Sequence, residues 1–218
     1  MTVEPSDLRT LKIATIKSVL KDRPRKLLGE EGWTKTAVLV PLVKQAGHWT
    51  ILFEERAHTL KRQPGEISFP GGHCDPGDPD EQSTAIRETS EELGVLEKDI
   101  EVIGDLDVLV TGAGLMVFPF AGVLPQDVRL QPNPHEVATA FSVSLAELLS
   151  TQPLVYEVTM KADPPDDYPY HLIPGGRSYP FRKSRTIQYF YQVNGYVIWG
   201  LTARILTHFL DVIRDKWV

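Results

Sequence analysis

A diglycine segment followed by an acidic helical segment is the feature that most constrains this chain of 218 residues. The diglycine is Gly71-Gly72, and the acidic residues are Glu88, Glu91 and Glu92. With helical periodicity, positions i, i+3 and i+4 lie on one face, where like charges repel each other unless a cation neutralises them. Carboxylate clusters suit hard cations such as Mg²⁺ or Mn²⁺. The sequence therefore predicts a divalent-metal site at the three glutamates, and the alternative interpretation is a solvated helix face.

The helix that carries these glutamates has start and stop signals of its own. Asp78 precedes Pro79, and Glu81 follows three residues after Asp78, which is the pattern of a capping box. Gly94 supplies a left-handed cap at the other end. We therefore expect a helix that begins after Asp78 and ends at Gly94.

Two neighbours of the acidic cluster are predicted to assist it. Arg87 lies four residues before Glu91, so we expect the two side chains to pair and to orient the cluster. Gly71 and Gly72 allow the backbone to approach a ligand closely, and a backbone carbonyl there is a further candidate for coordination.

The segment resembles a Nudix box, in which a glycine, a first glutamate and an Arg-Glu-x-x-Glu-Glu-x-Gly run follow at fixed spacing. The residues that match are Gly72, Arg87, Glu88, Glu91, Glu92, Gly94 and Val95. Three features depart from the pattern: Asp78 replaces the first glutamate, Thr89 replaces an aliphatic residue, and one extra residue precedes Arg87. The shorter acid and the extra residue are similar to the branch of the family that hydrolyses coenzyme A.

A second block resembles the same branch. Its matching residues are Arg56, Ala57, Gly65 and the run from Phe69 to Gly72, whereas Lys61 replaces an arginine and Phe53-Glu54 replaces Leu-Thr. Coenzyme A carries a 3′-phosphate besides its diphosphate, so the resemblance implies a cationic pocket. We expect Arg56, Lys61 and Arg62 to contribute to it, with Gly71 and Gly72 also contacting the substrate.

The resemblance implies a metal-dependent hydrolase of phosphoanhydride bonds, with Mg²⁺ or Mn²⁺ as cofactor. The expected substrate is coenzyme A or an acyl derivative, cleaved to 3′,5′-ADP and 4′-phosphopantetheine. Two alternatives stay open: another nucleoside diphosphate derivative such as ADP-ribose or NADH, or a non-catalytic nucleotide-binding module. The expected catalytic residues are Glu91, Arg87 and Glu136. The resemblance implies a general base that is either a glutamate of the box or an acid on a distant loop; Glu136 is the candidate on a distant loop, with a structural carboxylate as its alternative role.

Composition restricts the remaining classes. The formal net charge of −6 argues against a general nucleic-acid binder, which would show a basic surface. The single cysteine cannot form an internal disulfide, and the first twenty residues combine charges with no long apolar run. We therefore expect a cytoplasmic protein that does not insert into membranes.

Strand-like runs interspersed with a few helical patterns predict an α/β fold, a mixed sheet flanked by helices on both faces. The Nudix resemblance implies the same α/β/α sandwich. We expect residues 1–30 to form an N-terminal helix and a connection, and residues 31–218 to form the hydrolase domain with a C-terminal helix over 196–217. Trp199, Phe209 and Trp217 of that helix either form a homodimer surface or pack in a core or groove.

Overall fold

The computed structural model describes residues 12–24, 27–126 and 128–214. The chain forms two compact units, residues 1–33 and residues 34–218. In the first unit, helix α2 covers Ile13–Lys21 and a 3-10 helix covers Glu30–Gly32. The helical spacing of apolar residues over positions 6–21, with Ser6 as a plausible cap, predicts such a helix. It is confirmed over Ile13–Lys21, whereas Ser6 lies outside the described residues.

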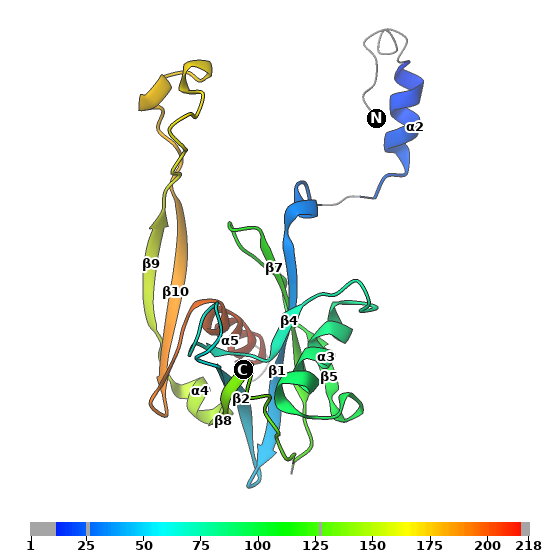
Figure 1. The fold of residues 1–218 in the computed structure, drawn as a ribbon, viewed down its shortest axis with the longest axis vertical. Coiled ribbons are helices and arrows are strands. Elements are labelled where there is room, and N and C mark those ends of the chain that lie inside the picture. The colour runs from blue at the N-terminus through cyan, green and yellow to red at the C-terminus, as the bar shows by residue number, and fades with distance from the viewer. Residues whose placement is uncertain (1–11, 25–26, 127, 215–218) are drawn as a thin grey trace. The chain divides into compact units, whose positions relative to one another are not determined.

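Within the described residues of the second unit, eight strands form one mixed sheet (Figure 1). Its main path runs β3-β2-β1-β7-β5, with β4 on β1, β6 on β7 and β8 on β2. The central pair, β1 and β7, is parallel, and the other pairings are antiparallel. The strands are β1 (Thr34–Gln45), β2 (His48–Arg56), β3 (Ile67–Ser68), β4 (Gly71–His73), β5 (Glu101–Asp105), β6 (Leu109–Val110), β7 (Leu115–Val123) and β8 (Val137–Ser144).

The β1–β2 hairpin follows from its turn residues. Ala46 and Gly47 both have positive φ, 48° and 83°, as a two-residue hairpin loop with the right-handed strand twist requires. Gln45 therefore pairs with His48. The sequence predicts this hairpin, because residues 45–48 separate two β-rich runs, and the structure confirms it.

Each face of the sheet has its own core, because side chains alternate along a strand. On β2, Ile51 and Phe53 point to the core that contains helix α5, Gly200–Arg214. Leu52 points to the opposite core, which contains helix α3, Glu81–Leu93. Helices thus cover both faces, and the predicted α/β/α class is confirmed.

Helix α3 begins two residues later than the capping pattern predicted. Asp80, not Asp78, is the N-cap, and its Oδ1 accepts a hydrogen bond from the Ser83 N–H at 2.8 Å. The cap predicted at Asp78 is wrong because the Asp78 carboxylate accepts hydrogen bonds from the Arg87 guanidinium instead. The end is as predicted, with Gly94 in the left-handed region at φ 69°.

A second, smaller sheet contains β9 (Leu154–Met160), β10 (Ser184–Val193) and β11 (Tyr196–Ile198) in the order β11-β10-β9. The helix predicted from residue 196 is wrong at its start. Asn194 and Gly195 have φ of 51° and 82°, so they form a tight turn that folds β11 back on β10. Residues 215–217 of the predicted helix lie outside the described residues.

Two further observations complete the fold. The sequence suggests a short helix over residues 144–149, and helix α4 covers Leu145–Ser150. Among the described helices, none is both long and apolar enough to cross a membrane.

Candidate active site

A cavity of about 570 Å³ lies where the ends of β1 and β2 meet the diglycine segment and α3. Its wall brings together charged side chains from distant parts of the sequence, so we name it the charged cavity. The charged residues that line it are Arg56, Arg62, Glu66, Glu88, Glu92 and Glu136. Gly71, Gly72, Ser68 and Thr202 also line it.

The diglycine segment leaves no room for side chains. A Cβ on Gly71, whose φ is +151°, would lie 2.2 Å from the Ala37 carbonyl oxygen. A Cβ on Gly72 would lie 2.4 Å from the carboxylate of Glu88. The two glycines therefore let β4 pass closely between β1 and the acidic face of α3.

The three predicted metal ligands on α3 do not share one environment. Glu88 and Glu92 line the charged cavity, and Glu92 is 4% exposed. The Gly71 N–H donates to Glu92 Oε2 at 2.8 Å. Glu91 is exposed, and its Oε2 lies 3.3 Å from Arg87 Nη1. A helix turn separates the two lining glutamates, whereas Glu91 is directed toward the arginine.

Arg87 ties the preceding loop to the helix. Its Nε and Nη2 each donate to the Asp78 carboxylate at 3.0 Å, and Nη2 lies 3.0 Å from Glu88 Oε1. The expected pairing with Glu91 is therefore present, as one of several. Hydrogen bonds from Arg87, with a further one from Thr84, hold the pKa of Asp78 well below its ordinary value. Asp78 thus anchors the loop in the ionised form.

A buried acidic residue that the sequence did not identify as part of the site lies beside this cluster. Glu54, on β2, is fully buried on the face toward α3, and Ser68 Oγ donates to its Oε1 at 3.0 Å. Burial raises the pKa of Glu54 to about 7. Burial, followed by the nearby charge of Glu54, raises the pKa of Glu92 to about 9. The sequence held one signal for this residue: Glu54 lies two positions after Leu52, so in a strand both side chains point to the same face of the sheet.

The donor set fits a divalent cation. Among the residues that the structure describes, two buried side-chain polar atoms have no hydrogen-bond partner, Glu54 Oε2 and Arg56 Nε. Glu88 and Glu136 both act electrostatically on Glu54 and Glu92, so four carboxylates share one region. Clustered carboxylate oxygens that raise one another's pKa are the donors that Mg²⁺ or Mn²⁺ would stabilise.

No preformed metal geometry is present, however. Within the described part of the chain, no three His, Cys, Asp or Glu side chains converge as metal ligands would. In this arrangement Arg87 lies 3.0 Å from Glu88 and 3.3 Å from Glu91, and the Gly71 N–H donates to Glu92 at 2.8 Å. The assignment of Glu88, Glu91 and Glu92 to a metal remains a prediction.

Not all of the residues predicted to bind the substrate line the charged cavity. Arg56 and Arg62 line the charged cavity together with Gly71 and Gly72. Lys61 is exposed on the adjoining loop and is not among the residues described as lining the cavity. The structure therefore places two of the three predicted basic side chains, Arg56 and Arg62, in the cavity that holds the acidic cluster.

Glu136 reaches the cavity from the loop before β8. Asn133 Nδ2 donates to its Oε2 at 3.2 Å, and its backbone carbonyl accepts from the Ala57 N–H at 2.8 Å. The residue thus lies beside the acidic cluster although it is far from Glu92 in the sequence. Its role as a general base remains a prediction.

Comparison with known proteins agrees with these features. Residues 33–162 match the family model described as the NUDIX domain. An uncharacterized Nudix hydrolase, NudL, from Photorhabdus laumondii is 35% identical over 170 residues, covering 78% of this chain and 80% of that protein. The chain therefore belongs to the Nudix hydrolase family and is a hydrolase of phosphoanhydride bonds.

Two further relatives carry a more specific name. A peroxisomal coenzyme A diphosphatase from Mus musculus is 41% identical over 118 residues, covering 54% of this chain and 50% of that protein. A mitochondrial coenzyme A diphosphatase from Homo sapiens is 39% identical over 176 residues, covering 79% of this chain and 66% of that protein. The chain thus spans half the length of the mouse relative. These relatives confirm the resemblance to the coenzyme A pyrophosphatase branch.

Proposed function

We propose that the protein hydrolyses the diphosphate bond of coenzyme A, or of its acyl derivatives, with Mg²⁺ or Mn²⁺ as cofactor. The observation that carries the proposal is the meeting of Glu88, Glu92 and Glu136 with Arg56 and Arg62 in one cavity beside the diglycine segment, with the buried Glu54 next to Glu92. The acidic side suits a divalent cation, and the basic side suits the phosphates of the substrate. The named activity of the mouse and human relatives supports the same substrate.

Glu88 and Glu92 would hold the cation, with Glu54 beside them and Glu91 as a supporting carboxylate. A bound divalent ion supplies a Lewis acid that offsets the negative charge of the diphosphate. Arg87 acts as a positioning residue, because it fixes Glu88 relative to the loop that Asp78 anchors. Arg56 and Arg62 would bind phosphate oxygens, for which the planar guanidinium is suited.

Glu136 is the residue we assign as general base. It lies on the cavity wall, and the hydrogen bond from Asn133 fixes one of its two carboxylate oxygens. The other oxygen would accept a proton from the attacking water as the phosphorus–oxygen bond of the diphosphate breaks. Each product keeps one phosphate of the cleaved diphosphate: 4′-phosphopantetheine, and 3′,5′-ADP, which also retains the 3′-phosphate.

The substrate is tested by product analysis. Coenzyme A, ADP-ribose and NADH are incubated with the protein, with and without Mg²⁺, and the products are separated by chromatography. We expect 3′,5′-ADP and 4′-phosphopantetheine in the presence of Mg²⁺ only. Faster cleavage of ADP-ribose or NADH would reassign the substrate, and binding of coenzyme A without turnover would indicate a non-catalytic module.

The acidic cluster is tested separately. Glu92→Gln and Glu91→Gln are each expected to lower the rate at least about a hundredfold, the scale of a lost metal ligand or acid–base group. The exposed Glu97→Gln serves as the control, and circular dichroism verifies that the fold survives. Near-normal turnover in both cluster variants would contradict the metal assignment.

Compartment and assembly belong to the same proposal. A cytoplasmic location remains a prediction, because the mouse relative is named peroxisomal and the human one mitochondrial. Cell fractionation tests it. A homodimer also remains a prediction, which light scattering in solution tests.

A further inference from the structure

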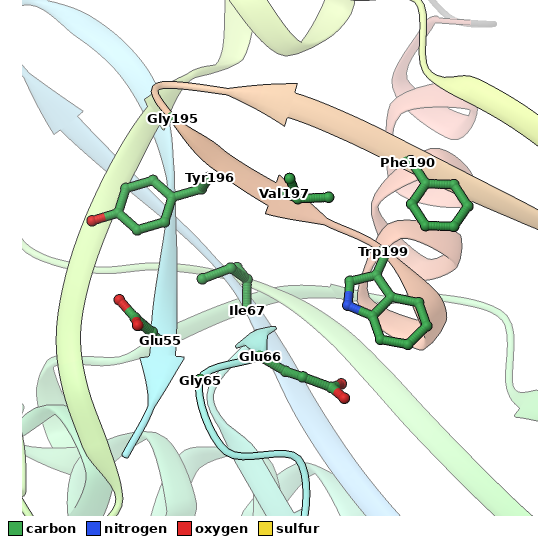
Figure 2. Close-up of a pocket in the computed structure, with 9 residues that line it drawn as sticks. All are labelled: Glu55, Gly65, Glu66, Ile67, Phe190, Gly195, Tyr196, Val197 and Trp199. Atoms are coloured by element: carbon green, nitrogen blue, oxygen red, sulfur yellow. The ribbon is translucent and has the colours of Figure 1, made fainter. Parts of the chain in front are cut away.

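A second cavity, of about 610 Å³, lies beside the charged cavity in the same unit. One wall is the segment from Gly65 to Ile67, and the other is formed by β10, β11 and Trp199 (Figure 2). Because Phe190, Tyr196 and Trp199 line it, we name it the aromatic cavity. The assigned chemistry uses none of these three residues.

The two cavities share a wall. Glu66 and Ile67 line both of them, so the two cavities lie on either side of this short segment, and a molecule with its diphosphate in the charged cavity would have to pass over it to reach the aromatic cavity. Hydrogen bonds to both backbone carbonyls of this wall hold it in place. Glu66 O accepts from the Arg56 N–H at 3.0 Å, and Ile67 O accepts from Thr202 Oγ1 at 3.0 Å.

The aromatic cavity is chemically unlike its neighbour. Among the described residues, those that line it include no lysine or arginine. The rings of Phe190 and Trp199 lie nearly parallel, at 5° with centroids 6.1 Å apart, and Trp199 is 39% exposed. Such a ring pair offers an apolar surface to a ligand.

Tyr196 and Glu55 lie at the other end of the cavity, whereas the Glu66 side chain extends toward the side of Trp199 (Figure 2). The Tyr196 ring stacks on Phe141 with centroids 3.7 Å apart, which fixes its position. Glu55 and Glu66 supply carboxylate oxygens that can accept hydrogen bonds from amide N–H groups. The same two charges repel phosphate. The cavity therefore favours an uncharged chain that contains amides and ends in an apolar group.

We propose that the aromatic cavity binds the pantetheine arm and acyl group of a coenzyme A thioester, and that Phe190 and Trp199 set the preference for acyl length. The inference rests on the proposed function and deepens it. The arm has two amide N–H groups that suit Glu55 and Glu66. Its acyl end carries no charge and would lie on the ring pair.

The experiment compares kcat/KM for free coenzyme A, butanoyl-coenzyme A and octanoyl-coenzyme A. We expect the unchanged protein to prefer the octanoyl thioester. Trp199→Ala should lower the ratio of octanoyl to free coenzyme A about tenfold, the scale of lost apolar contacts in a binding pocket. Trp199→Phe should recover most of that ratio, because it keeps an aromatic face.

Trp49→Ala is the matched control. Trp49 is 42% exposed, similar to Trp199, but lies beside the β1–β2 turn, where it pairs with Lys44. It should leave the ratio unchanged. Octanoyl-pantetheine, which is the arm without phosphate, provides a second readout by calorimetry. It should bind the unchanged protein and bind Trp199→Ala at least about tenfold more weakly.

The outcomes separate the two proposals. If no coenzyme A compound is hydrolysed, the proposed function fails and this inference fails with it. If hydrolysis is intact but the ratio and the binding of octanoyl-pantetheine are the same in Trp199→Ala, only the inference is overturned. A dimer that Trp199→Ala converts to a monomer, with the ratio unchanged, would overturn it in favour of a second copy of the chain as the occupant.

Discussion

The charged and aromatic cavities are built at the end of the same strand and differ in almost every other respect. Arg56 of β2 lines the first and Glu55 lines the second, because successive side chains point to opposite faces. In the charged cavity, polar groups are buried and tightly placed, and a Cβ on Gly72 would meet Glu88. In the aromatic cavity, Trp199 is partly exposed. Substitutions in the charged cavity should therefore almost always reduce activity. Truncation of a side chain in the aromatic cavity should leave hydrolysis intact and alter only the preference for acyl length.

The largest effect is expected from filling the diglycine segment. Gly72→Ala places a methyl group on the Glu88 carboxylate, so it should displace that side chain and lower kcat at least about a hundredfold. Gly77→Ala is the matched control, because no described atom lies within 4 Å of a Cβ there. Steady-state kinetics with coenzyme A measure both. Equal activity in the two variants would show that the charged cavity is not as closely fitted as its geometry indicates.

A smaller effect is expected at the basic wall. Arg62 lines the charged cavity and Lys61 does not, so Arg62→Glu should lower kcat/KM for coenzyme A about tenfold or more and Lys61→Glu should have less effect. The same assay with 3′-dephospho-coenzyme A identifies the phosphate involved. A loss that disappears with this substrate assigns Arg62 to the 3′-phosphate. No loss in either variant would remove both residues from the binding site.

The buried carboxylates predict how stability depends on pH. In the unfolded chain Glu54 and Glu92 titrate near their ordinary value of 4.5, whereas in the folded protein burial raises their pKa to about 7 and about 9. Between those values the folded state holds more protons, so the free energy of unfolding falls as pH rises from about 4.5 to about 9. Without metal, Tm should fall by at least about 5 °C from pH 5 to pH 9.

Scanning calorimetry measures this dependence. Glu92→Gln should flatten it, and added Mg²⁺ should raise Tm most at the alkaline end, where the carboxylates are ionised. If Tm is the same at pH 9 as at pH 5 and does not respond to Mg²⁺, the carboxylates do not form a shared cluster.

The smallest effect is expected from the N-terminal unit. Both cavities are lined by residues from Thr34 onward, so a chain that begins at residue 31 should keep kcat/KM within about twofold. This also tests the proposed domain boundary, with residues 31–218 as the hydrolase domain. A large loss of activity would assign residues 1–30 a part in the site.

The sequence correctly predicted those features that depend on residues close to one another in the chain. The Ala46–Gly47 turn and the glycine end of α3 are determined by residues within a few positions of each other. The Arg87–Glu91 pair follows from helical spacing alone. The predicted start of α3 was wrong by two residues, because two aspartates are candidates for the cap. Asp78 instead accepts hydrogen bonds from Arg87 and Thr84, and Asp80 accepts those from Ser83.

Long-range contacts explain what the sequence did not reveal. Glu54 becomes a buried partner of Glu92 only when β2 packs under α3. The strand at Tyr196–Ile198 has a spacing that also fits a helix, and its pairing with β10 depends on the Asn194–Gly195 turn. The aromatic cavity joins residues 55–67 to residues 190–199, which no local motif connects.

The parallel pairing of β1 with β7 has a consequence for how the protein folds. Thr36 Oγ1 donates to the Met116 carbonyl across 80 positions of sequence, and the diglycine segment and α3 lie within the intervening chain. During synthesis, β1 has no parallel neighbour until residue 123 has left the ribosome. Pairings of such high contact order form slowly. Refolding should therefore show early burial around the β1–β2 hairpin and recover activity only in a later phase, when the centre of the sheet closes.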